Sequence, residues 1–462
     1  MSPVLLGIVV YVAAQLAVGI VVTRRIRNES DYLLAGRSIG FGLGTFTVFA
    51  TWFGAETCIG AAGAIYENGL SGGSADPFGY AVCLFLMALL FAVPLWRRGL
   101  TTLADLFHSR YSPGVERAVV LMLAPTSVMW GGAQIRALGQ VLAASSALEV
   151  DIAITVAAAV VIAYTVYGGM LADVMTDLMQ GIALIIGLGL LFYAVAQAGG
   201  GLQASLASIE PQRLRLFGGP DMPWLDVAEN WAIPICGSVF AQELVARILA
   251  SRSPETARAA CLAGGCLYLA VGLIPVFIGL VGIRLMPGLD EAEQLLPQLA
   301  LKHLPAFSYV LFAGAIISAI LSTVDGALLA AAALVSHNLI VPLRPTMDDA
   351  GKVRTARAMV FVFGLVAYGL ALGSDGVHTL VEEASAFGSA GVFTVALFAL
   401  YTRRVGDRYS AYAALAAGMG AWLVGHFWLD LSHPYLISLG AALGGYLLTA
   451  AAEARLWPAE SR

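Results

Sequence analysis

Long apolar segments alternate with short polar breaks along most of this chain. A helix needs roughly 20 predominantly apolar residues to cross the hydrocarbon core of a bilayer. Dividing the sequence at its charged or Gly/Pro-rich breaks gives about 13 such segments by that criterion. They lie at 3–23, 41–66, 76–96, 118–147, 151–168, 174–198, 224–250, 259–283, 304–335, 357–374, 380–402, 410–428 and 433–453. We therefore predict an all-α polytopic membrane protein.

The composition agrees with this prediction. Of the 462 residues, 59% are hydrophobic and 12% are charged, whereas globular domains carry about 25% charged residues. The net charge of -5 provides no basic face for nucleic acid. The loops contain no phosphate-binding, zinc or hydrolase motif, so we expect no enzyme activity. The five cysteines lack metal-ligand spacing and are expected to be inert packing residues.

The distribution of basic residues predicts the orientation in the membrane. Most of the 25 Lys and Arg residues fall in segments that thirteen spans place on one side of the bilayer, at 24–37, 97–117, 247–258, 344–357, 403–408 and 455–462. Only Arg213, Arg215, Arg284 and Lys302 fall on the other side. Because cytoplasmic loops are enriched in basic residues, we expect the N-terminus outside and the C-terminus in the cytoplasm.

The apolar segment AGAIISAILSTVDGALLA, residues 313–330, contains an unusual set of polar residues. Ser318, Ser322 and Asp325 follow i, i+4, i+7 spacing and share a helical face, with Thr323 beside Ser322. Converging oxygen atoms suit a hard cation such as sodium. Serine and threonine can instead donate to the carbonyl four residues earlier. That alternative explains the hydroxyls but not the carboxylate of Asp325.

A second polar site is expected in FATWFGAETCIGAAG, residues 49–63. Here Glu56 lies among glycines that weaken helical regularity. A break would free backbone carbonyls for a cation, whereas close packing of small residues between helices is the alternative. Glu56 favours the functional interpretation, because ionisable groups within membrane spans are costly.

The remaining ionisable groups in the spans leave alternatives open. In YTVYGGMLADVMTDLMQG, residues 164–181, the Gly-Gly pair predicts a turn, and Asp173, Asp177 and Gln180 share a face. Asp173 is read as solvated at the interface and Asp177 as the deeper, functional candidate. Arg136 and Glu243 form either an ion pair with each other or parts of a binding site.

The chain resembles the sodium:solute symporter family over nearly its whole length. The segments that carry the resemblance follow in the order SDYLLAGRS, GAETCIGAAGAIYENG, TTLADLFHSRY, YTVYGGMLADVMTDLMQG, QELVARILASRSPETAR and SAILSTVDGALLAAAALVSHNLI. The resemblance implies a leucine-transporter-type core of two five-helix inverted repeats with discontinuous helices. The first repeat is expected at 41–198 and the second at 224–402, with an outer helix and loop at 1–40 and two helices and a tail at 403–462.

The same resemblance implies a sodium site. Its ligands are expected to be the carbonyls of Ala50, Phe53 and Ala319 and the hydroxyls of Ser322 and Thr323. The spacing of the last three, i, i+3 and i+4, lets them reach one point on a helix. Some members have a second sodium site, which matches Asp177, Ser322, Asp325 and Gly326 here. An acid and a glycine replace two serines, so Asp325 either strengthens that site or carries a proton instead.

The resemblance also bears on the solute. Sugar-transporting members have an Asn-Gln pair where this chain has Ala241 and Gln242, and Trp52 and Thr57 replace Asn and Gln in the broken helix. A small organic ion or an amino acid is therefore favoured over a sugar. Glu56 and Arg136 suit the two ends of an amino acid, Trp52 suits a cation or apolar group, and Glu243 completes the candidate set.

Together these features predict sodium-coupled symport of a small organic solute by alternating access, with Na+ as the coupling ion. Proton coupling through Glu56, Asp177 or Asp325 is one alternative. A transceptor that signals to a partner is another, although the short C-terminal tail argues against signalling within the chain. The expected partners are the solute, sodium and the lipid bilayer, in a monomer or weak homo-oligomer. The expected location is the bacterial plasma (inner) membrane.

Overall fold

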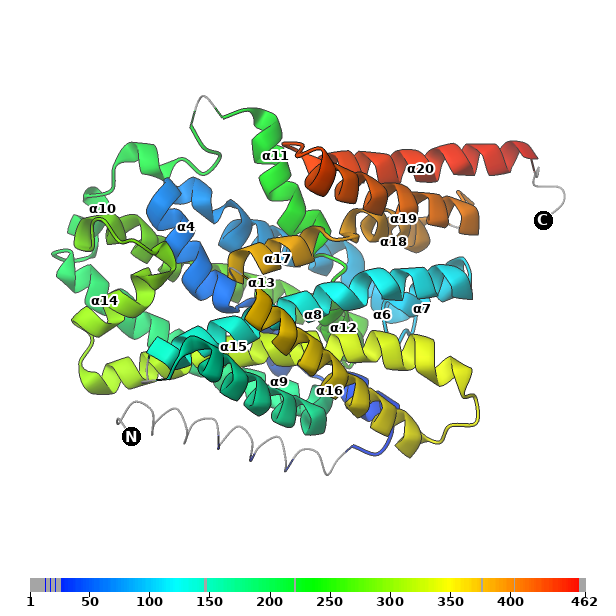
Figure 1. Cartoon of the computed structure of the whole chain (residues 1–462), viewed down its shortest axis with the longest axis horizontal. Helices are drawn as coiled ribbons and strands as arrows, with labels where there is room; N and C mark the ends of the chain where they lie inside the picture. The colour runs from blue at the N-terminus through cyan, green and yellow to red at the C-terminus, as the bar shows by residue number, and fades with distance from the viewer. Residues whose placement is uncertain are drawn as a thin grey trace.

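The computed structural model describes residues 26–144, 148–219, 222–374, 377–402 and 404–456, with isolated positions before residue 26. This part of the chain is helical and contains no strand (Figure 1). The all-α fold class is therefore confirmed. The predicted span at 3–23 lies almost wholly outside the described residues.

The helices differ widely in length. The long ones are α3 (Phe41–Trp52), α8 (Pro113–Ala144), α9 (Val150–Ala198), α13 (Pro254–Leu285), α15 (Ala306–Val335), α16 (Asp349–Gly373), α18 (Ser389–Tyr401), α19 (Arg408–Leu423) and α20 (Pro434–Leu456). The short ones are α2 (Glu29–Leu34), α4 (Ala61–Asn68), α5 (Tyr80–Leu86), α6 (Ala92–Arg97), α7 (Ala104–Arg110), α10 (Leu202–Ala207), α11 (Trp224–Ala232), α12 (Gln242–Ala250), α14 (Leu295–His303) and α17 (Val377–Ala386).

Several helices are long and apolar enough to cross a membrane. In the described part of the chain there are 8 of them, or 9 if α11 and α12 form one span bent by 43°. Two shorter apolar helices, Phe41–Trp52 and Val150–Ala163, lie where spans were also predicted. The structure therefore supports a multi-pass membrane protein, while the count of thirteen spans stays a prediction.

Glycine and polar caps fix where helices break and begin. The predicted turn at the Gly-Gly pair is present, because Gly169 interrupts α9 with φ 62° and ψ -179°. Asp348 accepts a hydrogen bond from the Gly351 N–H at 2.9 Å at the start of α16. Ser253 does the same for Thr256 at 3.1 Å at the start of α13. Such caps satisfy N–H groups that have no partner within the helix.

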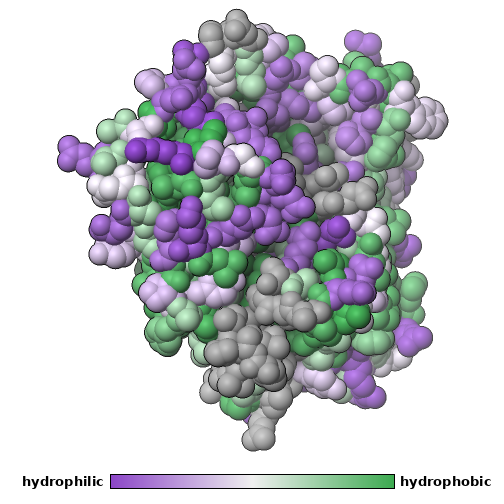
Figure 2. Space-filling model, turned by 60° about the vertical axis from the view of Figure 1, so that its left-hand side comes forward, coloured by the Kyte–Doolittle hydropathy of each residue, from purple (hydrophilic) through white to green (hydrophobic). Residues whose placement is uncertain are grey.

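Helix α15 lies at the centre of the bundle and packs against α8 and α9 (Figure 1). Its residues from Phe312 to Leu334 are nearly all buried, including Ser322, Thr323 and Asp325. Helix α13 packs against α3 and α4, and α19 pairs with α20. In Figure 2 the end of the molecule with α10 and α14 is turned toward the reader. Hydrophilic side chains gather on the face seen there. The polar residues of the apolar segment 313–330 are therefore interior groups.

Replacing Gly169 by alanine should destabilise the protein by about 1–3 kcal/mol, the usual cost of a residue held in this glycine-only backbone region. The added carbon would also lie 2.7 Å from the Tyr32 ring. Thermal unfolding of purified protein measures the effect. Gly189→Ala in α9 is the matched control, since that position has open space and no positive φ. Equal unfolding temperatures for the two variants would show that the break at Gly169 is not a constraint.

Candidate ion and solute sites

The break predicted near Glu56 separates α3 from α4. Phe53 leaves the helical region with φ -93° and ψ 71°, and a π-helical turn, Glu56–Gly60, follows. Among the described residues, no donor is hydrogen-bonded to the carbonyl of Ala50 or Phe53. The N–H of Ala55 is bonded instead to the side-chain oxygen of Gln134 on α8, at 3.0 Å. The break therefore leaves carbonyl oxygens available to a cation.

The middle of α15 lies directly against this break. The Thr323 hydroxyl donates to the Ala319 carbonyl at 3.1 Å, so these two candidate ligands are neighbours. A side-chain carbon at Gly54 would lie 2.9 Å from Thr323 Oγ1 and 2.6 Å from a Glu56 carboxylate oxygen. The structure thus brings the α3 break, Thr323 and Glu56 together.

Asp177 on α9 connects three helices. It accepts hydrogen bonds from the hydroxyls of Thr47 on α3 and Ser322 on α15. Asp325 accepts from Thr165 on α9 at 2.5 Å. Ser322 therefore belongs to both candidate cation sites, next to Thr323 on one side and bonded to Asp177 on the other.

A buried ion pair lies beside these carboxylates. Arg247 of α12 donates to Asp173 of α9, with side-chain exposures of 1% and 4%. Its Nε also donates to Thr51 at 3.0 Å. Asp173, predicted to be solvated at the interface, is therefore an interior residue, and that expectation was wrong. A side-chain carbon at Gly326 would lie 2.9 Å from this guanidinium, which explains a glycine next to Asp325.

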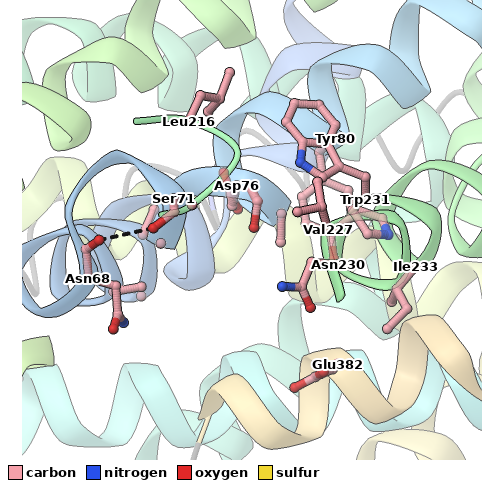
Figure 3. A pocket seen from close by; sticks show the side chains of 18 of the residues that line it. Asn68, Ser71, Asp76, Tyr80, Leu216, Val227, Asn230, Trp231, Ile233 and Glu382 are labelled. Atoms are coloured by element: carbon pink, nitrogen blue, oxygen red, sulfur yellow. Dashed lines mark hydrogen bonds between the residues drawn. The ribbon is translucent and has the colours of Figure 1, made fainter. Parts of the chain in front are cut away.

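A cavity of about 390 Å³ opens between α4, α11 and α17, next to the break. Its lining includes three carboxylates, from Glu56, Asp76 and Glu382, and the rings of Tyr80, Phe217 and Trp231. Figure 3 shows Asp76 and Asn230 on one side of the space and Glu382 of α17 across from them. None of the lining residues in the described part of the chain is Arg, Lys or His.

Two of these carboxylates are held by neutral groups. Gln134 Nε2 donates to Glu56 Oε2 at 2.7 Å. Asp76 accepts from the hydroxyls of Thr57 at 2.7 Å and Tyr268 at 2.6 Å. Both carboxylates are buried, with exposures of 5% and 6%. Thr57, a predicted solute ligand, is therefore a hydrogen-bond partner of Asp76 and is not among the residues that line the cavity.

An aromatic cluster stands behind the cavity wall. Tyr80 lines the cavity, and its ring centre lies 6.2 Å from that of Trp130. Trp130 in turn lies 5.7 Å from Trp52. Aromatic faces attract cations, so the wall combines negative charge with π surface.

The other predicted solute residues lie elsewhere. Arg136 donates to the Ala371 carbonyl of α16 at 2.9 Å and is not among the partners of Glu56 or Glu243 in the described residues. Gln242 accepts from the Leu103 N–H at 2.8 Å, which secures the start of α7. Ala241 is the residue before α12, and Glu243 faces Ser127 on α8. Of the predicted solute residues, only Glu56 lines the cavity.

Sequence reasoning missed Asp76, Gln134 and Thr47. Asp76 is the first residue of the predicted span 76–96. Its neighbours in the sequence give no sign that Tyr268 is its hydrogen-bond partner. Gln134 had a detectable signal, because Ser127, Trp130 and Gln134 share one helical face in α8. Arg136, two residues further on, points to the opposite side of the helix.

A second polar cluster joins α7 to the segment after α15. Asn338 donates to Asp105 at 2.6 Å and to Glu116 at 2.8 Å. Burial alone would raise the pKa of Asp105, but the hydrogen bond and charge of His337 and the N–H groups of Thr101 and Thr102 hold it below its usual range. The cluster fixes α7, α8 and α15 relative to one another.

Comparison with known proteins identifies relatives along most of the chain. The model of the sodium:solute symporter family matches residues 32–419. The human high affinity choline transporter 1 is 27% identical over 94% of this chain and 77% of its own length. The sodium/pantothenate symporter of Escherichia coli (strain K12) is 24% identical over 77% of this chain and 76% of its own length.

Solved structures with the same fold include two sodium- or cation-coupled transporters. A Na+-coupled sialic acid symporter in a substrate-bound outward-open state aligns with a TM-score of 0.86, 16% identity and 97% coverage of both chains. Mhp1, a nucleobase-cation-symport-1 family transporter, aligns with a TM-score of 0.63 at 16% identity, over 94% of this chain and 98% of its own. These similarities show the leucine-transporter-type fold.

Breaking the Arg247–Asp173 pair should be strongly destabilising. Arg247→Met leaves a buried carboxylate without its counter-charge, which typically costs about 3–5 kcal/mol. The double variant Arg247→Met/Asp173→Leu should recover most of this loss, because no unpaired charge remains. Thermal unfolding provides the measurement.

The exposed pair of Lys352 and Asp349, with side-chain exposures of 29% and 62%, supplies the control. Lys352→Met should cost less than about 1 kcal/mol. An equally small effect of Arg247→Met would mean that the buried pair is not maintained in the membrane.

Proposed function

The chain belongs to the sodium:solute symporter family, and on that premise we propose that the solute it carries with sodium is a small organic cation. Sodium-coupled symport of a small organic solute follows from the family and its transporter relatives. The cation class is the finer step, and it rests on the cavity beside the broken helix.

The charge of the cavity lining carries this proposal. Glu56, Asp76 and Glu382 contribute carboxylates, and the described lining residues contribute no basic side chain. Glu56 and Asp76 are buried, and buried charges require compensation, so a cation is favoured over an anion or a sugar. The position of Arg136, bonded to α16, removes the expected partner for a solute carboxylate. The relatedness to choline transporters supports the same class, because choline is a cation.

For sodium we propose the site at the break in α3. The ligands would be the carbonyls of Ala50, Phe53 and Ala319 and the hydroxyls of Ser322 and Thr323. The unbonded carbonyls at the break and the position of Thr323 against Gly54 support this set. Hard cations prefer such oxygen ligands. Asp177 and Asp325 form the proposed second site, which holds either another cation or a proton.

Sodium can couple to the solute through this geometry. The Glu56 carboxylate lies next to Gly54 and Thr323 and also lines the cavity. Sodium near Thr323 would therefore change the electric field at a cation bound in the cavity. Sodium would also stabilise the solute-binding state, because its affinity for that state is higher. A membrane potential of 100 mV contributes about 2.3 kcal/mol for each positive charge moved inward.

The cellular setting completes the proposal. The protein would lie in the plasma membrane with its N-terminus outside and its C-terminus in the cytoplasm, as the basic residues indicate. The two inverted repeats would occupy 41–198 and 224–402. It would work as a monomer or weak homo-oligomer.

Sodium should raise the unfolding temperature of the purified protein relative to potassium at equal ionic strength, and Ser322→Ala/Thr323→Ala should remove this effect. Binding stabilises by RT ln(1 + [L]/Kd), about 2.7 kcal/mol at 100 times Kd. Ser318→Ala is the matched control, since that hydroxyl donates to the Gly314 carbonyl at 2.6 Å.

If stability responded to pH but not to sodium, the coupling ion would be a proton. Asp325→Asn would then be the informative variant. It should abolish the pH response, and a variant that keeps the full pH response would rule out Asp325 as the proton-binding group.

A solute screen in sodium should select cations. The panel contains choline and ethanolamine as cations, proline as a zwitterion, pantothenate as an anion and galactose as a neutral sugar. We expect stabilisation by a cation, with stronger binding in sodium than in potassium, and uptake of that cation into proteoliposomes under a sodium gradient. Selective binding of galactose, proline or pantothenate would overturn the cation class.

A further inference from the structure

One carboxylate oxygen in the cavity has no hydrogen-bond partner. Glu56 Oε2 is bonded to Gln134, whereas Oε1 is buried and accepts no hydrogen bond from the described residues. The indole of Trp130 lies beside Glu56, but its N–H forms no hydrogen bond with the described residues. Buried polar atoms in proteins nearly always have a partner. Because Glu56 lines the cavity, a ligand is the natural source of the missing donor.

Asp76 adds further acceptors on the same wall. Each of its oxygens accepts one hydroxyl, from Tyr268 or Thr57, although an ionised carboxylate has about four acceptor positions. Both donors are neutral, so the charge of Asp76 is not compensated by them. The two carboxylates are also close enough to repel each other.

The charge balance calls for more than sodium. One sodium ion supplies one positive charge next to Glu56, and the cavity contains a second buried carboxylate, Asp76. The basic side chain of Arg247 is already paired with Asp173. A cationic solute completes the balance, which explains how the two carboxylates are tolerated in a membrane interior.

We propose that the solute is an amine whose charged nitrogen carries N–H donors, bound between Glu56 and Asp76, and not a quaternary ammonium ion. This inference rests on the cation class proposed above and narrows it. An N–H group supplies the charge-assisted hydrogen bond that Glu56 Oε1 lacks. A quaternary nitrogen has no such donor and is recognised by aromatic faces alone. In this cavity Tyr80 would contact the apolar part of the solute, with Trp130 behind it.

The test compares four compounds that differ only in methylation of the nitrogen. They are ethanolamine, N-methylethanolamine, N,N-dimethylethanolamine and choline. Dissociation constants are measured in sodium on the full-length protein by calorimetry. A site that hydrogen-bonds its substrate rejects an analogue without the donor by large factors. We expect at least about tenfold weaker binding at the last step, where the final N–H is lost.

Two isosteric variants test the residues. Glu56→Gln and Asp76→Asn should each weaken binding of ethanolamine by about tenfold or more, and Glu56→Gln should also reduce the preference over choline. Glu67→Gln is the control, because Glu67 is exposed on α4. An unfolding temperature close to that of the unaltered protein, without sodium or solute, shows that each variant is folded. The methylation series on the unaltered protein needs no variant at all.

The outcomes separate this inference from the proposed function. Choline binding as tightly as the amines, or more tightly, would overturn the N–H requirement and leave the cation class in place. Binding of a zwitterion, anion or sugar, with none of the four compounds bound at about 50 mM, which is about 50 times a typical high KM, would overturn both.

Discussion

The break in α3 depends on one side chain, the amide of Gln134. In the hydrocarbon core, main-chain polar groups have no water to bind, so an interrupted helix must find other partners. Gln134 uses its oxygen for the Ala55 N–H and its nitrogen for the Glu56 carboxylate. The same amide thus stabilises the break and orients the acid that follows it. The carbonyls of Ala50 and Phe53, on the other side of the break, accept no hydrogen bond from the described residues.

The interior charges follow from this arrangement. A carboxylate in a membrane interior is tolerated where it is paired or has a function. Asp173 is paired with Arg247, and this pairing separates it from the remaining acids. Asp177, Asp325 and Asp76 are held by hydroxyl groups. Hydroxyls orient a carboxylate without neutralising it, which fits the proposed second site at Asp177 and the proposed solute site at Asp76.

The sequence predicted the features that depend on neighbouring residues. Hydrophobic length located the long apolar helices that the structure describes. The Gly-Gly pair located the break at Gly169, and the glycines around Glu56 located the break after α3. The family resemblance supplied the fold class. The polar face of 313–330 correctly pointed to interior residues, because acids are excluded from lipid-facing positions.

Features that depend on distant partners were not predictable in this way. Asp173 and Asp177 lie four residues apart in the same apolar context. They differ in their distant partners, because Asp173 pairs with Arg247 of α12, whereas Asp177 accepts from Thr47 and Ser322. Asp76 acquires its environment from Tyr268, which is far away in the chain. Arg136 was chosen for its charge, although its position two residues after Gln134 directs it away from the break.

In the proposed arrangement, ion and solute are coupled because both bind one discontinuous segment. Gly54 has no room for a side chain, since an added carbon would meet both Glu56 and Thr323 at less than 3.0 Å. An ion bound by Ala50, Phe53 and Thr323 would therefore fix the backbone from which Glu56 projects. Fixing that backbone lowers the entropy still to be lost when a solute binds Glu56. By thermodynamic reciprocity, the solute must strengthen ion binding by the same factor. No long pathway is needed, because Phe53 of the proposed ion site and Glu56 of the proposed solute site are only three residues apart along the same broken segment.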